Sequence, residues 1–324
     1  MPKVSVIIPV FGVEKYMERC ARSLFEQTLD DIEYLFIDDC TPDRSIEILK
    51  SILEEYPHRK SQVIIHRMEK NSGQAAVRKW GTLNATGDYI IHCDSDDWVD
   101  TEMYRAMYEK AIEENSDIVI CDYCRTDGQS RIEYFSAFKN NLKKKRSIRA
   151  FLIGKYPWSL WNKLIKRSTY TNNDIIFPKD SMGEDRVLCM QCVFYCEKIS
   201  YIPKSYYFYY INHSSITHHQ RDVYSFRNNK HLYDFFLSKK GYNNFAQIYA
   251  IETYRNARRY DFQPASIQDI FPYTPTGVFA KISYQLVIGK CPLLFADYFF
   301  RVFRFIVCFL TLNKRHDCHI NVNT

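Results

Sequence analysis

Short apolar runs alternate with segments of helical period over the first 121 residues of this chain. After the first run, for example, Met17, Cys20 and Leu24 recur at helical spacing. The connecting segments are long enough for a helix to carry the chain back to the start of a parallel neighbouring strand. The pattern therefore favours an α/β fold with a doubly wound, mostly parallel sheet and flanking helices. The expected strands are residues 4–10, 32–37, 62–66, 89–93 and 117–121.

The strand at residues 89–93 runs directly into a cluster of carboxylates. Asp94, Asp96 and Asp97 would lie at the carboxyl end of this strand, where open α/β sheets bind ligands. Carboxylates this close repel one another unless a cation or hydrogen-bond donors offset their charge. Two interpretations fit the cluster. One is a hard divalent ion that bridges to a substrate diphosphate. The other is an acidic turn that caps a helix expected at residues 98–112.

The composition is that of a folded protein. A hydrophobic fraction of 46% excludes a disordered chain, and a net charge of +6 suits an anionic ligand or a membrane surface. We expect no nucleic-acid partner. The 11 cysteines complete no zinc spacing, which indicates free thiols in a reducing cytoplasm. We also expect no signal peptide before the first strand and no transmembrane helix.

The alternation loosens after residue 125. Glu184 and Asp185 precede an apolar helix expected at residues 187–195, and residues 201–211 read as an aromatic strand. Beyond Ser214 the chain is largely of helical period and rich in Tyr, Phe and Arg. We place a domain boundary near residue 220, between a sheet domain at 1–220 and a helical, aromatic-rich extension at 221–324.

Several sequence blocks stand at the expected strand ends. They are residues 4–11, Asp38 with Asp39, residues 71–78, residues 85–89 with Asp94-Ser-Asp96, and Glu184 with Asp185. Taken together, residues 3–215 resemble the family 2 glycosyltransferases of the bacterial polysaccharide type. The resemblance implies a GT-A fold, which is Rossmann-like, and transfer of a sugar from a nucleotide diphosphate donor.

In that family the first strand's end and an aspartate of the second strand hold the nucleoside. Carried over, the resemblance implies a uracil and ribose site in which Asp39 accepts a hydrogen bond from the base N3–H. For either member of the Asp38–Asp39 pair, the alternative role is capping of the next helix. Gly12 stands where the family usually has Asn, which leaves the nucleotide preference open. The expected donor contacts here are Pro9, Val10, Phe11, Glu14, Asp39 and Asn71.

The resemblance assigns the acidic cluster to the diphosphate end of the donor. Asp96 becomes the principal ligand of Mn²⁺ or Mg²⁺, Asp94 a ribose or metal contact, and Ser95 a spacer within the donor site. Asp97 is expected either to cap the next helix or to support the metal ligands from behind. Arg78 would contact the diphosphate, because a guanidinium fork matches phosphate oxygens. The alternative for Arg78 is an exposed position on a helix.

Glu184 and Asp185 would supply the proton chemistry. An acceptor hydroxyl needs a carboxylate to take its proton as it attacks C1 of the sugar. The resemblance points to Asp185 for this role, with Glu184 as the rival base, in a single inverting displacement. The alternative for both is a pair of acids favoured by a helix N-terminus.

Four further features have two interpretations each. Trp158 and Trp161 either stack on a sugar or belong to the core. His213 lies either in a segment that closes over the diphosphate or on the solvated surface. The basic run at residues 143–146 is either a solvated face or a contact to anionic lipid. Asp297, Arg301 and Arg304 form one polar stripe on an apolar segment at residues 292–312, which resembles a helix in a membrane interface. The alternative for that segment is docking on the catalytic domain or on a second subunit.

We therefore predict an inverting, metal-dependent glycosyltransferase. It would move a sugar from a UDP-sugar to a hydroxyl of a glycan or lipid-linked glycan in cell-surface polysaccharide synthesis, in the cytoplasm or on the inner face of the membrane. One alternative is a sugar-nucleotide nucleotidyltransferase, but the segment from Val10 to Glu14 lacks the basic, glycine-rich loop which that reaction needs. The other is an inactive membrane-associated scaffold, against which Asp94, Asp96 and Asp185 argue.

Overall fold

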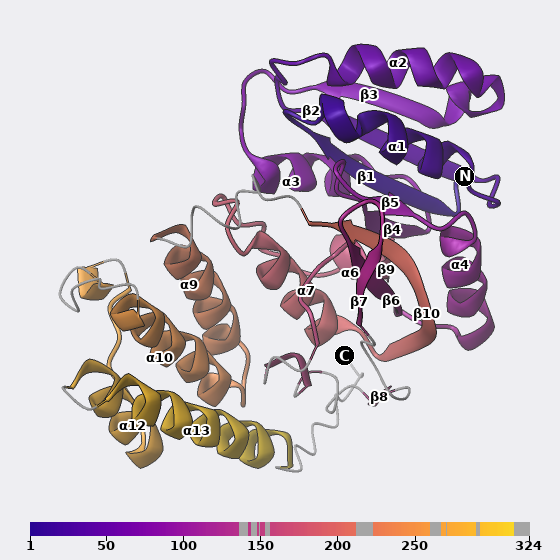
Figure 1. Ribbon diagram of the computed structural model, residues 1–324. Helices are drawn as coiled ribbons and strands as arrows, with labels where there is room; N and C mark the ends of the chain where they lie inside the picture. The colour runs from indigo at the N-terminus through magenta and orange to yellow at the C-terminus, as the bar shows by residue number, and fades with distance from the viewer. Residues whose placement is uncertain are drawn as a thin grey trace. The chain divides into compact units, whose positions relative to one another are not determined.

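The computed structural model describes residues 1–135, 142–143, 148, 150–152, 156–211, 223–259, 267–269, 271–289 and 292–313 (Figure 1). Its chain divides into two compact units. The first, here the sheet unit, comprises Met1–Ile148 and Tyr156–Ser225. The second, here the helical unit, comprises Arg149–Lys155 and Phe226–Thr324. Residues 144–146 of the basic run and His213 lie outside the described residues.

Four parallel strands form the first half of the sheet, in the order β3-β2-β1-β4. Their bounds are β1 Val4–Val10, β2 Ile32–Asp38, β3 Val63–Arg67 and β4 Tyr89–His92, which confirms the predicted strands within a residue. Every residue of β2 is buried, as expected for a strand covered on both faces.

Helices cover both faces of this half of the sheet. Val4, Val6 and Ile8 of β1 share one core with α1 (Glu14–Phe25), α2 (Ser45–Glu55) and α4 (Met103–Glu114). The opposite face meets α3 (Gln74–Asn84), where a Cβ on Gly81 would lie 2.5 Å from the Ile7 side chain and 2.8 Å from that of Ile37. Glycine at this position lets α3 approach the sheet closely.

The second half of the sheet contains antiparallel strands that the sequence did not reveal. β9 (Lys163–Lys166) lies antiparallel between β4 and β6 (Ile118–Thr126), so the order continues β4-β9-β6-β10-β5. β10 (Lys198–Tyr210) runs parallel to β6, while β7 (Arg131–Phe135) and β8 (Leu142–Lys143) pair off this path. Lysines at both ends of β9 leave it without the apolar run that is typical of a buried strand. Lys163 is nevertheless buried, and it donates to the Pro157 and Ser159 carbonyls.

The helix expected at residues 98–112 begins later than predicted. Trp98 and Val99 form the short strand β5, which pairs antiparallel with β10, and the helix α4 starts only at Met103. The Trp98 ring stacks on Phe208 of β10, with ring centroids 5.4 Å apart. Pairing with a distant strand therefore overrides the helical period here. By contrast, the predicted helix after Glu184 and Asp185 is α7 (Glu184–Tyr195).

The helical unit contains α10 (Asn243–Arg259), α12 (Val278–Ile288), α13 (Leu293–Asn313) and most of α9 (Val223–Ser238). One residue of the polar stripe predicted on α13, Asp297, does not belong to it. Asp297 is buried, and its carboxylate accepts hydrogen bonds from Arg255 and Arg259 of α10. In the part of the chain that is described, no helix is long and apolar enough to cross a membrane. The two basic residues after this helix, Lys314 and Arg315, lie outside the described residues.

Candidate active site

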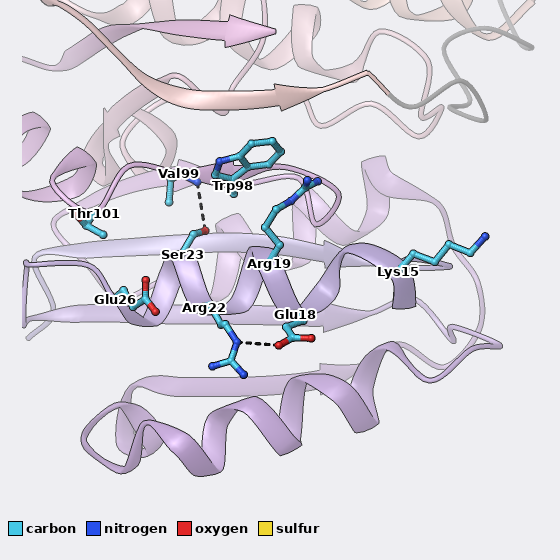
Figure 2. A pocket seen from close by; sticks show the side chains of 9 residues that line it. All are labelled: Lys15, Glu18, Arg19, Arg22, Ser23, Glu26, Trp98, Val99 and Thr101. Atoms are coloured by element: carbon cyan, nitrogen blue, oxygen red, sulfur yellow. Dashed lines mark hydrogen bonds and ion pairs between the residues drawn. The ribbon is translucent and has the colours of Figure 1, made fainter. Parts of the chain in front are cut away.

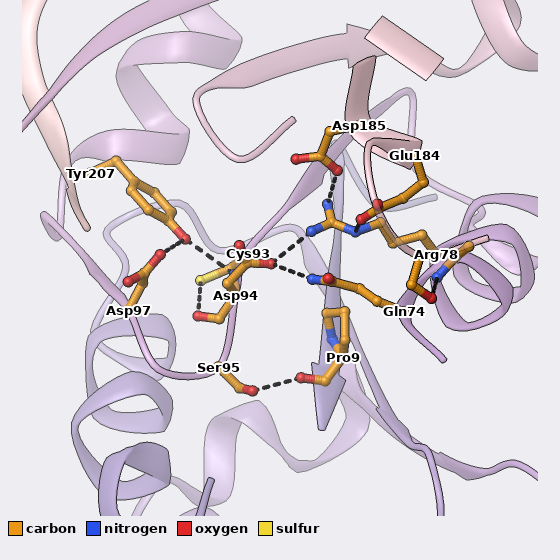
Figure 3. A network of polar contacts seen from close by, with 12 residues as sticks. Pro9, Gln74, Arg78, Cys93, Asp94, Ser95, Asp97, Glu184, Asp185 and Tyr207 are labelled. Atoms are coloured by element: carbon orange, nitrogen blue, oxygen red, sulfur yellow. Dashed lines mark hydrogen bonds and ion pairs between the residues drawn. The ribbon is translucent and has the colours of Figure 1, made fainter. Parts of the chain in front are cut away.

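Arg78 is the centre of a buried charge cluster at the strand ends (Figure 3). It lies one turn into α3, and each of its guanidinium nitrogens faces a different carboxylate. Nη2 donates to Asp94 Oδ1 at 2.9 Å, Nη1 lies 3.1 Å from Asp185 Oδ1, and Nε lies 3.4 Å from Glu184 Oε1. The alternative of an exposed helical arginine is therefore wrong.

The loop before α3 is fixed by Asp39. Its two carboxylate oxygens accept hydrogen bonds from the backbone N–H groups of Ser72 and Gly73, at 2.7 and 2.8 Å. Gly73 has a φ of +82°, which glycine adopts without strain, and α3 begins at the next residue. Asp39 thus connects the end of β2 to the helix that carries Arg78.

Burial disfavours the ionised forms of the side chains in this cluster. Burial by itself would lower the pKa of Arg78, but the charges of Asp185, Asp94 and Glu184 outweigh that effect and raise it. Burial, with smaller contributions from Asp185 and Asp96, raises the pKa of Asp94 to about 6 against the opposing effect of Arg78. Burial and Asp185 likewise raise the pKa of Glu184 well above its ordinary value. Three acids thus share one buried guanidinium, and a further cation would relieve the repulsion between those that are ionised.

Residues 94–97, here the acidic turn, are held from four sides. Ser95 Oγ donates to the Pro9 carbonyl at 2.6 Å, and Arg19 Nη2 of α1 donates to the Asp96 carbonyl at 3.0 Å. Gln74, which the sequence reasoning did not single out, donates from Nε2 to Asp94 Oδ1 at 3.2 Å. Ser95 is therefore more than a spacer, because it ties the acidic turn to β1.

The fourth side is Tyr207 of β10. Its hydroxyl accepts the Asp94 N–H at 3.1 Å and donates to Asp97 Oδ2 at 2.6 Å. Asp97 Oδ1 also accepts the Tyr210 N–H at 2.7 Å. The predicted capping role of Asp97 is wrong, since this carboxylate joins the acidic turn to β10 and α4 begins beyond it without a side-chain cap. Nothing in the aromatic run of β10 marks Tyr207 as the member that meets an acidic turn.

The residues expected to contact the nucleoside either hold neighbouring backbone or are exposed in this structure. The Val10 carbonyl accepts the Asp39 N–H at 3.0 Å, and Glu14 Oε2 accepts the Arg44 N–H at 3.1 Å. Phe11 and Asn71 are exposed. Asp38 accepts from the Thr41 N–H and pairs with Arg67 Nη1 at 2.9 Å, so neither Asp38 nor Asp39 caps α2.

Glu184 and Asp185 form the first turn of α7, after Gly183 at a φ of +86°. Their surroundings differ. The Glu184 side chain is 5% exposed, whereas that of Asp185 is 25% exposed. Of these two acids, Asp185 is the one that combines contact with Arg78 and access for a second molecule.

The two tryptophans have different surroundings. Trp161 is 6% exposed and stacks on Tyr207 with ring centroids 4.3 Å apart, which confirms its core interpretation. Trp158 is half-buried and lies under the Arg186 guanidinium at 4.8 Å. Stacking on a sugar therefore stays a prediction for Trp158.

A groove of about 580 Å³ follows α1 and β5 beside the acidic turn. Figure 2 shows Arg19 and Trp98 at one side of it and Arg22 paired with Glu18 at the other. Arg19 covers one face of the Trp98 ring at 3.7 Å, and Phe208 stacks on that ring. These neighbours occupy the indole faces, so Trp98 supports the acidic turn through Arg19 rather than forming a platform for a sugar.

Comparisons with known proteins identify the family and the fold of this chain. Residues 5–188 match the model of the family described as glycosyl transferase family 2. The chain is 30% identical over 230 residues to glycosyltransferase GlyA of Streptococcus pneumoniae serotype 4, which covers 66% of this chain and 31% of GlyA. It therefore spans about a third of the length of that relative.

Two solved structures are similar in fold. The S. aureus TarS 1-349 complex with UDP-GlcNAc has a TM-score of 0.65 and 18% sequence identity, over 94% of this chain and 90% of that chain. The mannosyltransferase PcManGT from Pyrobaculum calidifontis, in complex with GDP-Man and Mn²⁺, has a TM-score of 0.52 and 14% identity, over 96% and 87%. The likeness to TarS confirms the predicted GT-A fold.

Proposed function

This chain belongs to glycosyltransferase family 2, and we propose that it catalyses the inverting, metal-dependent transfer of a sugar from a UDP-sugar to a hydroxyl of a glycan or lipid-linked glycan. The observation that carries the proposal is the convergence of Asp94, Glu184 and Asp185 on Arg78 at the strand ends. Elements far apart in the sequence thereby bring a donor-side acid and an acceptor-side acid to one place. The UDP-GlcNAc bound by TarS, a protein of the same fold, supports the choice of donor.

The acidic turn fits a divalent cation that is shared with the donor. Asp94 and Asp96 offer hard carboxylate oxygens from a single turn. Among the described residues, no group of three or more His, Cys, Asp and Glu side chains could hold a metal ion. Mg²⁺ typically takes one or two carboxylates and completes its shell with water and substrate phosphate. Mn²⁺ or Mg²⁺ bound at Asp94 and Asp96 would offset charge that develops on the diphosphate.

Arg78 has a restricted route to the diphosphate. All three guanidinium nitrogens lie within 3.4 Å of a carboxylate and the Arg78 side chain is 2% exposed, so a phosphate oxygen would reach Arg78 when one of these carboxylates moves aside. Asp185 is the member that moves most readily, because its side chain is the most exposed of the three and no hydrogen bond of its Oδ1 is formed in the described structure. Donor binding would then free Asp185 for the acceptor.

Asp185 serves as the general base in this proposal. It takes the proton of the acceptor hydroxyl while the oxygen attacks C1 of the sugar from the side opposite the diphosphate. Glu184 is buried and has a raised pKa, so it suits a neutral or positioning role better. Pro9, Val10, Phe11 and Asp39 stay assigned to the nucleoside at the ends of β1 and β2.

A reducing cytoplasm is the proposed location of the enzyme. The nine cysteines within the described residues are all free thiols, which supports this compartment. We further propose a role in cell-surface polysaccharide synthesis, since the relatives with similar sequences include a poly(ribitol-phosphate) β-N-acetylglucosaminyltransferase.

The proposal is tested by thermal unfolding of the full chain with UDP-, GDP- and dTDP-sugars, each with Mn²⁺ and with EDTA. A ligand at 100 times its Kd stabilises a protein by about 2.7 kcal/mol, which is readily measured. We expect stabilisation by a UDP-sugar that needs Mn²⁺ and is lost in Asp96→Asn. Equal stabilisation in EDTA would remove the metal from the proposal, and a stronger response to GDP-sugars would change the donor.

A further inference from the structure

The outer side of α13 carries a line of large apolar side chains that are exposed. Phe295, Tyr298, Val302, Phe305 and Phe309 are spaced alternately by three and four residues, so they share one face of the helix. Tyr298 is 67% exposed, and Phe295 and Phe305 are more than half exposed. The opposite face, with Ala296, Phe300 and Phe303, is buried in the helical unit.

The neighbouring helix α12 extends this surface. Val278, Phe279 and Ile282 are exposed there, and α12 and α13 pack against each other and against α10. Since α10 packs against one side of both helices, the sides of α12 and α13 that face away from α10 lie next to each other. We name this surface the outer apolar face; its members are Val278, Phe279, Ile282, Leu294, Phe295, Tyr298, Val302, Phe305 and Phe309.

The exposed charges on the two helices are all positive. Lys281 and Arg301 are exposed, and Arg304 is partly exposed. The only acid in either helix, Asp297, turns inward and pairs with Arg255 at 3.1 Å and with Arg259. The buried ion pairs thus remove the one carboxylate that would oppose an anionic surface.

We propose that the outer apolar face binds an anionic lipid surface, with α12 and α13 lying in the membrane interface. Aromatic and aliphatic side chains would enter the boundary between headgroups and acyl chains, while Lys281 and Arg301 meet lipid phosphates. A second copy of the chain fits less well, because it would bring positive charges together without an exposed carboxylate on either helix to pair with them.

Flotation of the full-length protein with lipid vesicles tests this proposal. One set of vesicles contains phosphatidylcholine alone, and the other contains phosphatidylcholine with phosphatidylglycerol. We expect the protein to float with the anionic vesicles at low salt, less at high salt, and not with the neutral ones. Failure to float with anionic vesicles at low salt would overturn the proposal.

Two double variants separate the apolar and the charged contributions. Phe295→Asp with Phe305→Asp should abolish flotation, and Lys281→Glu with Arg301→Glu should weaken it by about tenfold or more. The matched control is Ile112→Asp, which places an acid at an exposed apolar position of α4, and it should float like the wild type. Stabilisation by UDP-sugar, measured on the same variants, should be unchanged, so this test is independent of the proposed transfer reaction.

Size-exclusion chromatography with light scattering completes the test. A wild-type dimer that does not float, and that the Phe295→Asp, Phe305→Asp variant converts to a monomer, would assign the face to a second copy and overturn the lipid proposal. Flotation that survives the phenylalanine substitutions would also overturn it. A monomeric wild type that floats with anionic vesicles supports it.

Discussion

Arg78 Nη1 lies 3.1 Å from Asp185 Oδ1, yet neither atom forms a hydrogen bond within the described structure. The pair is therefore held by charge rather than by directed bonding. Arg78 Nη2, by contrast, does donate to Asp94. The guanidinium thus holds Asp94 firmly and Asp185 loosely, as the proposed release of Asp185 on donor binding would require.

Removal of the guanidinium should unfold the site. Arg78→Leu leaves Asp94, Glu184 and Asp185 close together without their shared cation, which costs about 3–5 kcal/mol for a broken buried ion pair. Urea unfolding at neutral pH measures this loss. Arg67→Leu is the control, because Arg67 is 65% exposed and pairs with a single aspartate. Equal stability of the two variants would show that Arg78 is not the centre of the charge cluster.

Loss of the general base should separate binding from transfer. Asp185→Asn keeps the shape of the side chain and should leave UDP binding intact while slowing transfer by ~10²–10⁴-fold. Steady-state kinetics and calorimetry on the same preparation measure both. Glu184→Gln is the matched control on the preceding residue. If Glu184→Gln slows transfer more than Asp185→Asn with intact UDP binding, the two roles are exchanged.

The Tyr207 hydroxyl should matter for metal-dependent binding. Tyr207→Phe keeps the stack on Trp161 but leaves the Asp94 N–H and the Asp97 carboxylate without this partner, at a cost of about 1–3 kcal/mol. We expect a weaker Mn²⁺-dependent affinity for UDP together with lower stability. Tyr209→Phe, two residues further along β10, serves as the control. An unchanged Mn²⁺ dependence in Tyr207→Phe would confine Tyr207 to a role in folding.

A methyl group at Gly81 should disturb the site from a distance. Gly81→Ala forces the Ile7 and Ile37 side chains to give way, with overpacking that costs about 1–3 kcal/mol, against about 1 kcal/mol gained in helix propensity. The displaced α3 would move Arg78, so UDP affinity should fall with stability. Lys79→Ala, at an exposed position of the same helix, is the control. Full UDP affinity in Gly81→Ala would show that α3 tolerates the shift.

Local sequence patterns were sufficient to predict much of the fold. The apolar runs of β1, β2 and β4 and the helical spacing of α1 and α2 are properties of short segments, so they are visible without partners. The blocks at the strand ends predicted which acids would gather, and the structure places Asp94, Glu184 and Asp185 around Arg78. Parallel strands bring their carboxyl ends to one edge, which is why blocks so distant in sequence could be expected to meet.

Pairing between distant segments decided the rest. β9 carries lysines in place of an apolar run, and its position between β4 and β6 depends on partners that the segment itself does not specify. Asp97 reads as a helix cap until β10 brings Tyr207 to it. Asp297 reads as part of a polar stripe until α10 presents Arg255 and Arg259. The sequence by itself determined the periodic elements and the set of acids. Only tertiary contacts decided which charge each acid meets, because burial and partner choice arise between elements and not within them.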